Sequence, residues 1–384
     1  MKYTKLSFIF LCLLLTLSAC GDVPASADAA SPPAGAAEAG SLQDTGDPAM
    51  LDLFSMDTFM SFQAYGADAE SALSNVSAMI TSLDSQLSVT NESSEIYQVN
   101  HASGASVTLS GATADLLSKA LALGRSTDGA LELTSYPLSR LWGFTTGEYQ
   151  IPTQSQIDSL LPLVDDSQIT LSDQTVTIPD GAQLDLGAVA KGYAGDQAAE
   201  ILQSHGVSSA LLNLGSSTIH AIGTKPDGSD WRIAIQDPED TSAYAGVVSI
   251  SDRSVNTSGG YERYFEGEDG KIYWHILDPK TGYPADSGLR SVTILSDSAL
   301  TGDGLSTALF VMGLDKAVSY WQDNGGFDFI LITADGEIYL TEGAEACFSP
   351  LGKYVNAPLH VIRHADWAAA FPFSFHRDRW SISL

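Results

Sequence analysis

Two separate stretches of the chain carry the side chains that could perform chemistry. In the first, residues 184–194, a short apolar strand ends near Asp185, a glycine turn follows, and a helix begins whose opening turns carry Lys191. A strand, glycine turn and helix start of this kind presents backbone N–H groups and the positive end of a helix dipole to a phosphate. Taken alone, the same pattern is more often ordinary α/β architecture.

The second stretch brings a histidine and a pair of oxygen donors into one part of the sequence. His275 precedes a tight Asp-Pro-Lys-Thr-Gly turn at 278–282, and Asp303 and Thr307 follow. Residues four apart on a helix lie on one face, so these last two side chains can direct their oxygens to one point. Mg²⁺ is held by one or two protein oxygens, with substrate phosphates completing its shell. An Asp and a Thr at this spacing also suit a plain helix start.

His275 is the candidate general base and Lys191 the candidate phosphate ligand. The unperturbed pKa of an imidazole lies near neutrality, which suits proton removal from an alcohol, and a lysine acts on phosphate as a point charge. The competing interpretations are a structural histidine in a strand before a turn and a solvated helix lysine. The neighbours of Lys191 include the apolar Val189, Ala190 and Tyr193, which argues against a fully solvated lysine.

The elements that must position these residues follow from the spacing of apolar side chains. Helices and strands interleave without a regular βαβ spacing, so we expect an α+β fold with mixed sheets and interleaved helices in a single large domain. The pattern predicts helices over 67–87, 112–124, 155–161, 188–206, 305–312 and 315–323, strands over 59–65, 169–176, 183–186, 210–214, 220–222, 231–236 and 246–250, and a hairpin of 328–333 with 337–340.

The N-terminus has the pattern of an export leader. Two lysines precede an apolar run over 6–17, which is too short for a permanent membrane span but suits a secretory leader. The run ends Leu-Ser-Ala-Cys and resembles the lipobox of bacterial lipoproteins, in which Cys20 becomes the lipid-bearing N-terminus. We therefore expect a signal peptide at 1–19, a flexible tether at 20–50, and an extracytoplasmic protein lipid-anchored to the cell membrane. The alternative is an ordinary signal peptide with an incidental cysteine.

Composition limits the range of partners. The formal net charge is −29 and no basic stripe occurs, which argues against nucleic-acid binding. A multiply charged anionic substrate would be repelled by such a surface, so binding one requires a local exception such as a bound cation and a lysine. With Cys12 in the leader and Cys20 lipidated, only Cys347 remains, so no internal disulfide is expected.

Several short blocks occur together and in a fixed order between about residues 51 and 340. They are Met56-Asp57-Thr58, Gly129-Ala130, Pro137-Leu138, Leu141-Trp142-Gly143-Phe144, Lys191-Gly192-Tyr193-Ala194, Thr257-Ser258-Gly259, His275 to Pro284, and Asp303 with Leu305 to Phe310. In this order the blocks resemble the ApbE family, the FAD:protein FMN transferases. The resemblance implies a flavin transferase domain over 51–345, which leaves 346–384 as a C-terminal extension without an assigned role.

The resemblance also implies roles for individual residues. His275 would be the catalytic residue. Met56 and Ile276 would contact FAD, although both could equally be residues of the hydrophobic core. The implied FAD contacts are Met56, Ala130, Leu131, Glu132, Asp185, Lys191 and Ile276, and the implied metal ligands are the backbone carbonyl of Ala188, Asp303, Thr307 and, as a further candidate, Ser306.

The reaction that the resemblance implies is a Mg²⁺-dependent transfer of FMN from FAD to a threonine hydroxyl of an acceptor protein, with release of AMP. The implied acceptors are extracytoplasmic domains of redox proteins. Two alternatives keep the same site: an FAD pyrophosphatase that yields FMN and AMP, and a flavin-binding lipoprotein without turnover. A generic solute-binding lipoprotein fits the leader and tether but not the Asp303 and Thr307 blocks.

Some positions depart from the family pattern. Glu132 stands where the family commonly has an aspartate. Thr90 stands where the family usually has an aromatic residue, soon after the Leu87-Ser88 pair. The change at Thr90 could shift the balance between transfer of FMN to a protein and hydrolysis of FAD by water. Ser110-Gly111-Ala112-Thr113 resembles an acceptor sequence for flavin, so self-modification at Thr113 is one interpretation. The other, which we favour, is that Ser110 is the N-cap of the predicted helix.

Overall fold

The computed structural model describes residues 46–364 of the chain. The predicted signal peptide, Cys20 and nearly all of the predicted tether lie outside these residues, as do residues 365–384 of the C-terminal extension. Within 46–364 there is no helix whose length and apolar character would let it cross a bilayer.

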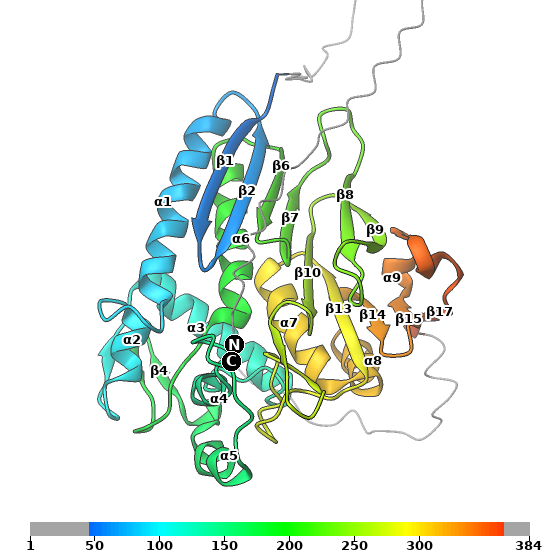
Figure 1. Ribbon diagram of the computed structural model, residues 1–384. Helices are drawn as coiled ribbons and strands as arrows, with labels where there is room; N and C mark the ends of the chain where they lie inside the picture. The colour runs from blue at the N-terminus through cyan, green and yellow to red at the C-terminus, as the bar shows by residue number, and fades with distance from the viewer. Residues whose placement is uncertain (1–45, 365–384) are drawn as a thin grey trace, which may run out of the picture. The chain divides into compact units, whose positions relative to one another are not determined.

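One large sheet organises the described part of the chain (Figure 1). Its neighbouring strands are antiparallel except for the last pair, which is parallel, so the predicted α+β fold with mixed sheets is confirmed. Across the nine-stranded sheet the order is β1 (Ala49–Ser55), β2 (Thr58–Tyr65), β6 (Ser209–Leu214), β7 (Thr218–Ile222), β10 (Ser254–Gly259), β13 (Leu289–Ser296), β14 (Phe327–Thr333), β15 (Ile338–Thr341) and β17 (Leu359–Ile362).

Three smaller sheets accompany the large one within residues 46–364. The single strand predicted over 169–176 is instead a hairpin of β4 (Thr170–Ser172) and β5 (Thr175–Thr177), because Asp173 adopts a left-handed φ of 51° and reverses the chain. The small sheets are β16 (Phe348–Pro350), β9 (Tyr244–Ile250) and β8 (Trp231–Gln236); β3 (Val107–Thr108), β5 (Thr175–Thr177) and β4 (Thr170–Ser172); and β11 (Tyr264–Glu266) with β12 (Ile272–Trp274).

The helices begin and end close to the predicted positions, with one informative exception. The helix predicted from residue 305 begins six residues earlier, at Ala299, because the Ser298 side chain accepts the Thr301 N–H and caps it. The helices are α1 (Ala69–Leu87), α2 (Glu95–Asn100), α3 (Gly111–Ser126), α4 (Tyr136–Trp142), α5 (Gln154–Leu160), α6 (Gly187–Ser204), α7 (Ala299–Met312), α8 (Leu314–Asn324) and α9 (Glu342–Glu345).

Alternating side chains give the central strands two buried faces. Helices α1 and α6 lie against β1, β2 and β6, and α7 lies against β10 and β13 (Figure 1). On β13 and β14, Ile294 and Phe329 pack with α7 and α8, whereas Ile330 packs with β8 and β9. Because both faces are covered, even polar side chains of β13 such as Ser291 and Thr293 are fully buried.

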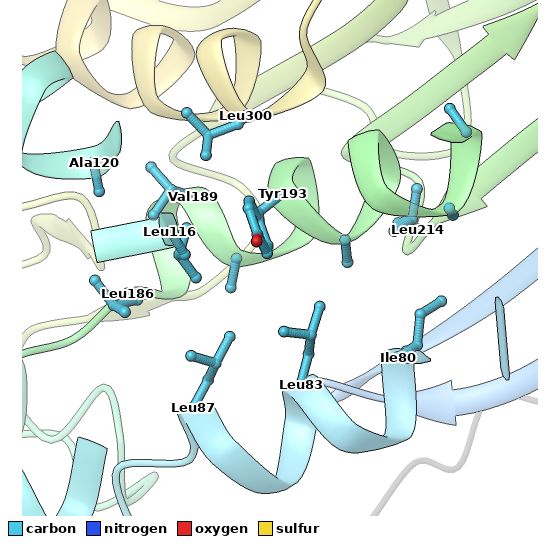
Figure 2. Packing of buried hydrophobic residues seen from close by; sticks show 14 of the residues in the cluster. Ile80, Leu83, Leu87, Leu116, Ala120, Leu186, Val189, Tyr193, Leu214 and Leu300 are labelled. Atoms are coloured by element: carbon cyan, nitrogen blue, oxygen red, sulfur yellow. The ribbon is translucent and has the colours of Figure 1, made fainter. Parts of the chain in front are cut away.

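A second apolar layer fixes the start of α6. Leu83 and Leu87 of α1, Leu116 of α3 and Val189 and Tyr193 of α6 are buried in one cluster (Figure 2). Burial of a large apolar side chain contributes about 1.5–3 kcal/mol to folding. The opening turns of α6, which carry the predicted phosphate motif, are therefore anchored by packing on two other helices.

The segment predicted as a strand over 183–186 joins no sheet. Its hydrogen bonds go elsewhere: the Leu184 N–H donates to Oδ1 of Asn100 over 2.6 Å, Asn100 Nδ2 donates to the Leu184 carbonyl over 2.9 Å, and the Asp185 N–H donates to the Leu133 carbonyl over 2.8 Å. The Asn100 side chain thus satisfies the backbone N–H and carbonyl of Leu184, as a neighbouring strand would. The spacing of apolar residues cannot predict such a contact.

Residues 346–364, assigned from the sequence to the C-terminal extension, contribute to the fold. Strand β16 pairs with β9, and β17 pairs in parallel with β15. The side chains of Phe348 and Tyr354 are buried beside β8 and β9. This part of the extension therefore packs on the same core as residues 51–345.

Candidate functional site

Asp185 lies at the N-terminal end of α6. Its Oδ1 accepts the Gly187 N–H over 2.8 Å, which satisfies one of the free donors of the first helical turn. Burial raises the pKa of Asp185, while the Gly187 N–H and the cations of Arg263 and Lys191 oppose this rise. The carboxylate is thus bonded to the backbone where the predicted phosphate motif begins, within the electrostatic influence of two cations.

Helices α6 and α7 touch backbone to backbone at Gly192. A Cβ on this residue would lie 2.3 Å from the Ala299 carbonyl oxygen, so only glycine permits the approach. The Gly192 N–H donates to Oδ2 of Asp303 over 2.9 Å. In an α-helix the same N–H points at the carbonyl of the residue four positions earlier, here Ala188. The Ala188 carbonyl and the Asp303 carboxylate therefore lie around one N–H group.

Asp303 is a buried carboxylate, with only 6 % of its surface exposed. Thr218 on β7 donates its hydroxyl to Oδ1 over 3.2 Å, and no Lys, Arg or His among residues 46–364 forms a salt bridge with it. Burial raises the pKa of Asp303, and the charge of Lys191 and the bonds from Gly192 and Thr218 only partly offset this. A cation bound at this carboxylate would relieve the cost of burying its charge.

Three hydroxyls lie beside Asp303 where α7 meets β10. Ser258 Oγ is 2.7 Å from Ser306 Oγ and 3.3 Å from Thr307 Oγ1. Ser306 is fully buried and donates to the Asp303 carbonyl over 2.8 Å, whereas Thr307 is only partly buried. Of the two predicted hydroxyl ligands, Thr307 is the one that is not fully buried.

His275 follows β12 and is held by Arg263. Its backbone N–H donates to the Arg263 carbonyl over 3.0 Å, and its Nδ1 lies 3.2 Å from the same oxygen. Because a carbonyl only accepts, Nδ1 must carry the proton, which leaves the lone pair of Nε2 free. His275 is half-buried, and desolvation, followed by the charges of Arg263 and Lys191, lowers its pKa to about 4.

Lys191 connects the two predicted stretches. The residue after it, Gly192, is bonded to Asp303, and the Lys191 charge opposes the raised pKa of Asp185 and Asp303 and lowers the pKa of His275. It forms no salt bridge with any residue in 46–364. The structure thus brings together Lys191, His275 and Asp303, and the lysine is available to an anion from outside the chain.

Met56 lies in the two-residue turn between β1 and β2. Met56 and Asp57 have left-handed φ angles of 50° and 58°, an uncommon conformation for a methionine. The next residue, Thr58, lies against Gly215, where a Cβ would approach Thr58 Oγ1 to 2.3 Å. The turn therefore lies beside the β6–β7 connection. This connection leads into β7, whose first residue, Thr218, is bonded to Asp303.

The other predicted FAD contacts differ from one another in burial. Ala130 is half-buried, whereas Leu131 and Ile276 are buried in the core. A Cβ on Gly304 of α7 would meet Leu131 Cδ2 at 3.1 Å, so this leucine packs between α7 and its neighbours. The side chains of Leu131 and Ile276 therefore support the site by packing.

Glu132 is occupied by protein contacts. Its Oε1 accepts the N–H and the hydroxyl of Thr134 over 2.8 and 2.6 Å, and its Oε2 accepts the Asp166 N–H over 3.2 Å. Burial, together with the charge of Glu132, raises the pKa of Asp166 to about 7. In the described structure Glu132 thus organises the loop before α4.

The acceptor-like sequence folds as a helix start. Ser110 Oγ accepts the Thr113 N–H, and the Thr113 side chain is fully buried. The N-cap interpretation of Ser110 is therefore confirmed. Thr90, the other unusual position, is exposed and bonds to Ser88.

Several residues of the site received no role from the sequence. Ser258 and Gly192 lie within the short blocks Thr257-Ser258-Gly259 and Lys191-Gly192-Tyr193-Ala194, so the sequence carried a signal for them. Thr218 and Arg263 carried no local signal, because their contacts with Asp303 and His275 are made across the fold.

Known proteins resemble this chain over most of its length. The chain matches the ApbE family model over residues 56–331. A Klebsiella pneumoniae (strain 342) protein named FAD:protein FMN transferase is 35 % identical over 311 residues, which is 80 % of this chain and 92 % of that protein. An Escherichia coli (strain K12) protein of the same name is 33 % identical over 305 residues, covering 76 % of this chain and 86 % of that protein.

Solved structures agree with this relationship. The ApbE protein from Thermotoga maritima has a TM-score of 0.73 at 30 % identity and covers 78 % of this chain and 99 % of its own. A structure described as the flavin transferase ApbE from Vibrio cholerae has a TM-score of 0.70 at 28 % identity, again covering 78 % of this chain and 99 % of its own. The family-model match over residues 56–331 includes Lys191, His275 and Asp303.

Proposed function

The chain belongs to the ApbE family and is a transferase, and we propose that it moves FMN from FAD to a threonine hydroxyl of an acceptor protein in a Mg²⁺-dependent reaction that releases AMP. The observation that carries the proposal is the hydrogen bond from the Gly192 N–H to Asp303, which places the buried carboxylate beside the residue that follows Lys191, together with the effect of the Lys191 charge on His275. A dinucleotide pyrophosphate needs cationic groups and a metal on its oxygens, and its acceptor needs a base.

The residues present suit a hard cation. Asp303 supplies a carboxylate, Thr307 a hydroxyl and Ala188 a backbone carbonyl, and the carbonyl and carboxylate already meet at the Gly192 N–H. Within 46–364 no three His, Cys, Asp or Glu side chains form a metal cluster, so one carboxylate leaves room for substrate phosphates, as Mg²⁺ prefers. When bound, Mg²⁺ would neutralise charge on the pyrophosphate oxygens.

In the proposed step the threonine oxygen attacks the phosphorus on the FMN side of FAD. A new P–O bond forms, the bond from that phosphorus to the bridging oxygen breaks, and AMP leaves with the bridging oxygen. His275 Nε2 accepts the hydroxyl proton, since Nδ1 is directed to the Arg263 carbonyl. Lys191 holds the pyrophosphate as a point charge. Asp185, at the opening of α6, contacts the dinucleotide through polar groups of the adenosine.

One assay separates this function from its alternatives. The protein is incubated with FAD, Mg²⁺ and an acceptor domain carrying a flavinylation threonine. Yellow fluorescence that stays with the acceptor on a denaturing gel supports transfer. Free FMN and AMP without labelled acceptor would indicate an FAD pyrophosphatase, and unchanged FAD with saturable binding would indicate a flavin-binding protein. Omission of Mg²⁺ tests the metal requirement in the same experiment.

We also propose that the protein acts outside the cytoplasm, anchored by lipid on Cys20, with redox-protein domains as acceptors. The support is the leader followed by Leu-Ser-Ala-Cys in the sequence. Expression of the wild type and Cys20→Ala, followed by membrane fractionation, tests this. Retention of both proteins in the same fraction would contradict the anchor.

A further inference from the structure

A single stripe of α6 faces α7. Ala188, Gly192 and Asp196 are spaced four residues apart, so they lie on one face of the helix. Gly192 contacts both Ala299 and Asp303 of α7, as described above. Asp196, one turn further along α6, extends the same contact to the first residues of α7.

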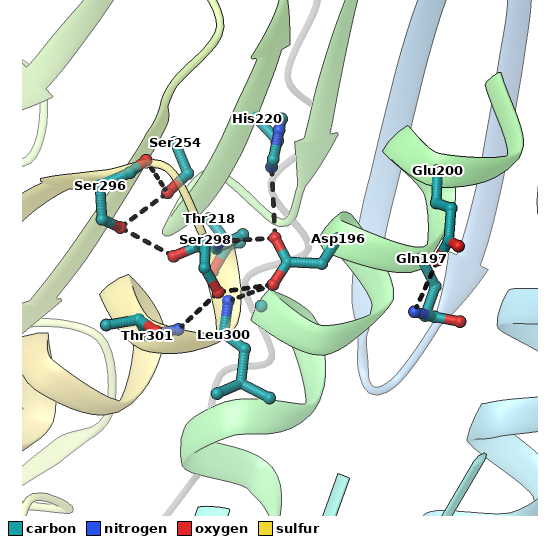
Figure 3. Close-up of polar contacts among 12 residues, drawn as sticks. Asp196, Gln197, Glu200, Thr218, His220, Ser254, Ser296, Ser298, Leu300 and Thr301 are labelled. Carbon is teal, nitrogen blue, oxygen red and sulfur yellow. Dashed lines mark hydrogen bonds and ion pairs between the residues drawn. The ribbon is translucent and has the colours of Figure 1, made fainter. Parts of the chain in front are cut away.

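Asp196 holds the N-terminus of α7 by three hydrogen bonds (Figure 3). Its Oδ1 accepts the Ala299 N–H over 2.6 Å, and its Oδ2 accepts the Leu300 N–H over 3.1 Å and the Ser298 hydroxyl over 2.7 Å. The free N–H groups at a helix start are normally capped by a residue next to it in sequence. Here the N-cap Ser298 takes the Thr301 N–H, and a carboxylate from another helix takes the two preceding ones.

A histidine limits how far the Asp196 carboxylate can move. His220 on β7 is buried, and its Nδ1 lies 3.6 Å from Oδ1 of Asp196 (Figure 3). Burial lowers the pKa of His220, with the charges of Asp196 and Asp252 opposing the shift. The imidazole packs beside the carboxylate on the side of the sheet, opposite the α7 donors.

We propose that Asp196 is a positioning residue for the metal ligands on α7, a role that rests on the function proposed above. Asp303 lies one helical turn beyond Ala299, so any slide of the helix start displaces its carboxylate from the Gly192 N–H and the Ala188 carbonyl. A slip of one residue along a helix axis is about 1.5 Å, whereas ligand geometry must hold within about 0.5 Å. The contacts of Asp196 are with the start of α7 and with His220, so it would act on the metal ligands through α7.

The test compares Asp196→Ala and Asp196→Asn with the wild type in the full chain. Mn²⁺ binding without FAD is followed by the electron paramagnetic resonance of the free ion, and the Mg²⁺ activation constant is measured with FAD as substrate. Residues that orient metal ligands typically contribute 10–100-fold to affinity, so Asp196→Ala should weaken Mn²⁺ binding at least tenfold. FAD affinity in the absence of metal, measured by flavin fluorescence, should be unchanged.

The asparagine variant separates position from charge. Asp196→Asn loses the same charge but keeps an oxygen that can accept the Ala299 N–H, so it should lose clearly less metal affinity than Asp196→Ala. Equal losses in the two variants would assign the effect to charge and overturn the proposal, as would unchanged metal binding in both. Asp196→Asn also keeps the test decisive if Asp196→Ala fails to fold.

A matched control distinguishes loss of a helix cap from loss of the metal site. Ser110→Ala removes the cap of α3, far along the chain from α7, and should lower thermal stability with no change in Mn²⁺ affinity. Weakened Mn²⁺ binding in this variant would show that metal affinity follows general stability and would contradict the proposal. If the wild type itself neither binds Mn²⁺ nor responds to Mg²⁺, the metal-dependent function fails rather than the role of Asp196.

Discussion

The backbone N–H of Gly192 donates to Oδ2 of Asp303 over 2.9 Å, across the contact between α6 and α7. The same N–H is directed at the Ala188 carbonyl within its own helix. Two oxygens from different helices are thereby brought together, and one of them belongs to a buried carboxylate whose pKa is raised by burial. The proposed cation should stabilise this arrangement, which has a measurable consequence.

Asp303→Asn should abolish Mg²⁺-dependent stabilisation. The pKa of Asp303 is higher in the folded than in the unfolded chain, so its contribution to folding stability is lost as the pH rises through the folded pKa. At neutral pH the metal-free variant should therefore unfold at a temperature equal to or above that of the wild type. Mg²⁺ at 100 times its Kd should stabilise the wild type by about 2.7 kcal/mol and the variant not at all. Thermal unfolding with and without Mg²⁺ measures both effects.

A Mg²⁺ response that survives in Asp303→Asn would show that the ion binds elsewhere. Turnover of FAD by this variant at the wild-type rate would remove Asp303 from the mechanism altogether.

His275→Gln should lower kcat by about 10²–10⁴-fold, the usual contribution of a general base, with FAD affinity largely kept. Because the pKa of His275 is about 4, the wild-type ring is neutral at all physiological pH values. Titration of His275 should therefore cause no change in kcat/KM near pH 6.5. Histidine NMR, with the His275 signal assigned by its absence in the variant, should show titration well below 6.5. A titration near 6.5 would contradict the proposed surroundings of the ring.

The residues that carry charge could be predicted from the sequence, whereas their surroundings could not. Lys191, His275 and Asp303 stand in motifs with a local pattern, and the turn after His275 closes as predicted, with the Gly282 N–H bonded to the Asp278 carbonyl. The role of Asp196 and the contact of Thr218 with Asp303 depend on which helix faces which strand. The strand predicted over 183–186 was wrong for the same reason, since the side chain of Asn100 replaces the sheet partner.

Lys191→Met should raise the KM for FAD and the pKa of His275 together. A contact between a charged group and phosphate contributes about 1.5–3 kcal/mol, which corresponds to roughly tenfold or more in KM. The Lys191 charge lowers the pKa of His275, so its removal should move the NMR titration upward. Lys316→Met, on the exposed surface of α8, is the matched control and should change neither quantity. A raised KM with an unchanged pKa of His275 would show that the Lys191 charge does not act on His275, and would contradict the shared site.

Thr113 should carry no FMN after incubation of the protein with FAD and Mg²⁺. Its side chain is fully buried and its N–H is bonded to Ser110, so neither a second copy nor the chain's own site can reach the hydroxyl without unfolding α3. Intact-protein and peptide mass spectrometry measure this directly. An adduct of FMN mass on the peptide that contains Thr113 would disprove the structural role assigned here.

Gly192→Ala should damage stability and the metal site together. Its Cβ would lie 2.3 Å from the Ala299 carbonyl oxygen, so α7 must shift away from α6. Overpacking of this kind costs about 1–3 kcal/mol, and the shift should also separate Asp303 from the Gly192 N–H and weaken Mg²⁺ binding. Gly111→Ala, in a helix with nothing within 4 Å of the added Cβ, should be neutral or slightly stabilising and keep the metal response. Normal Mg²⁺ binding in Gly192→Ala would mean that the ion does not depend on the contact between the two helices.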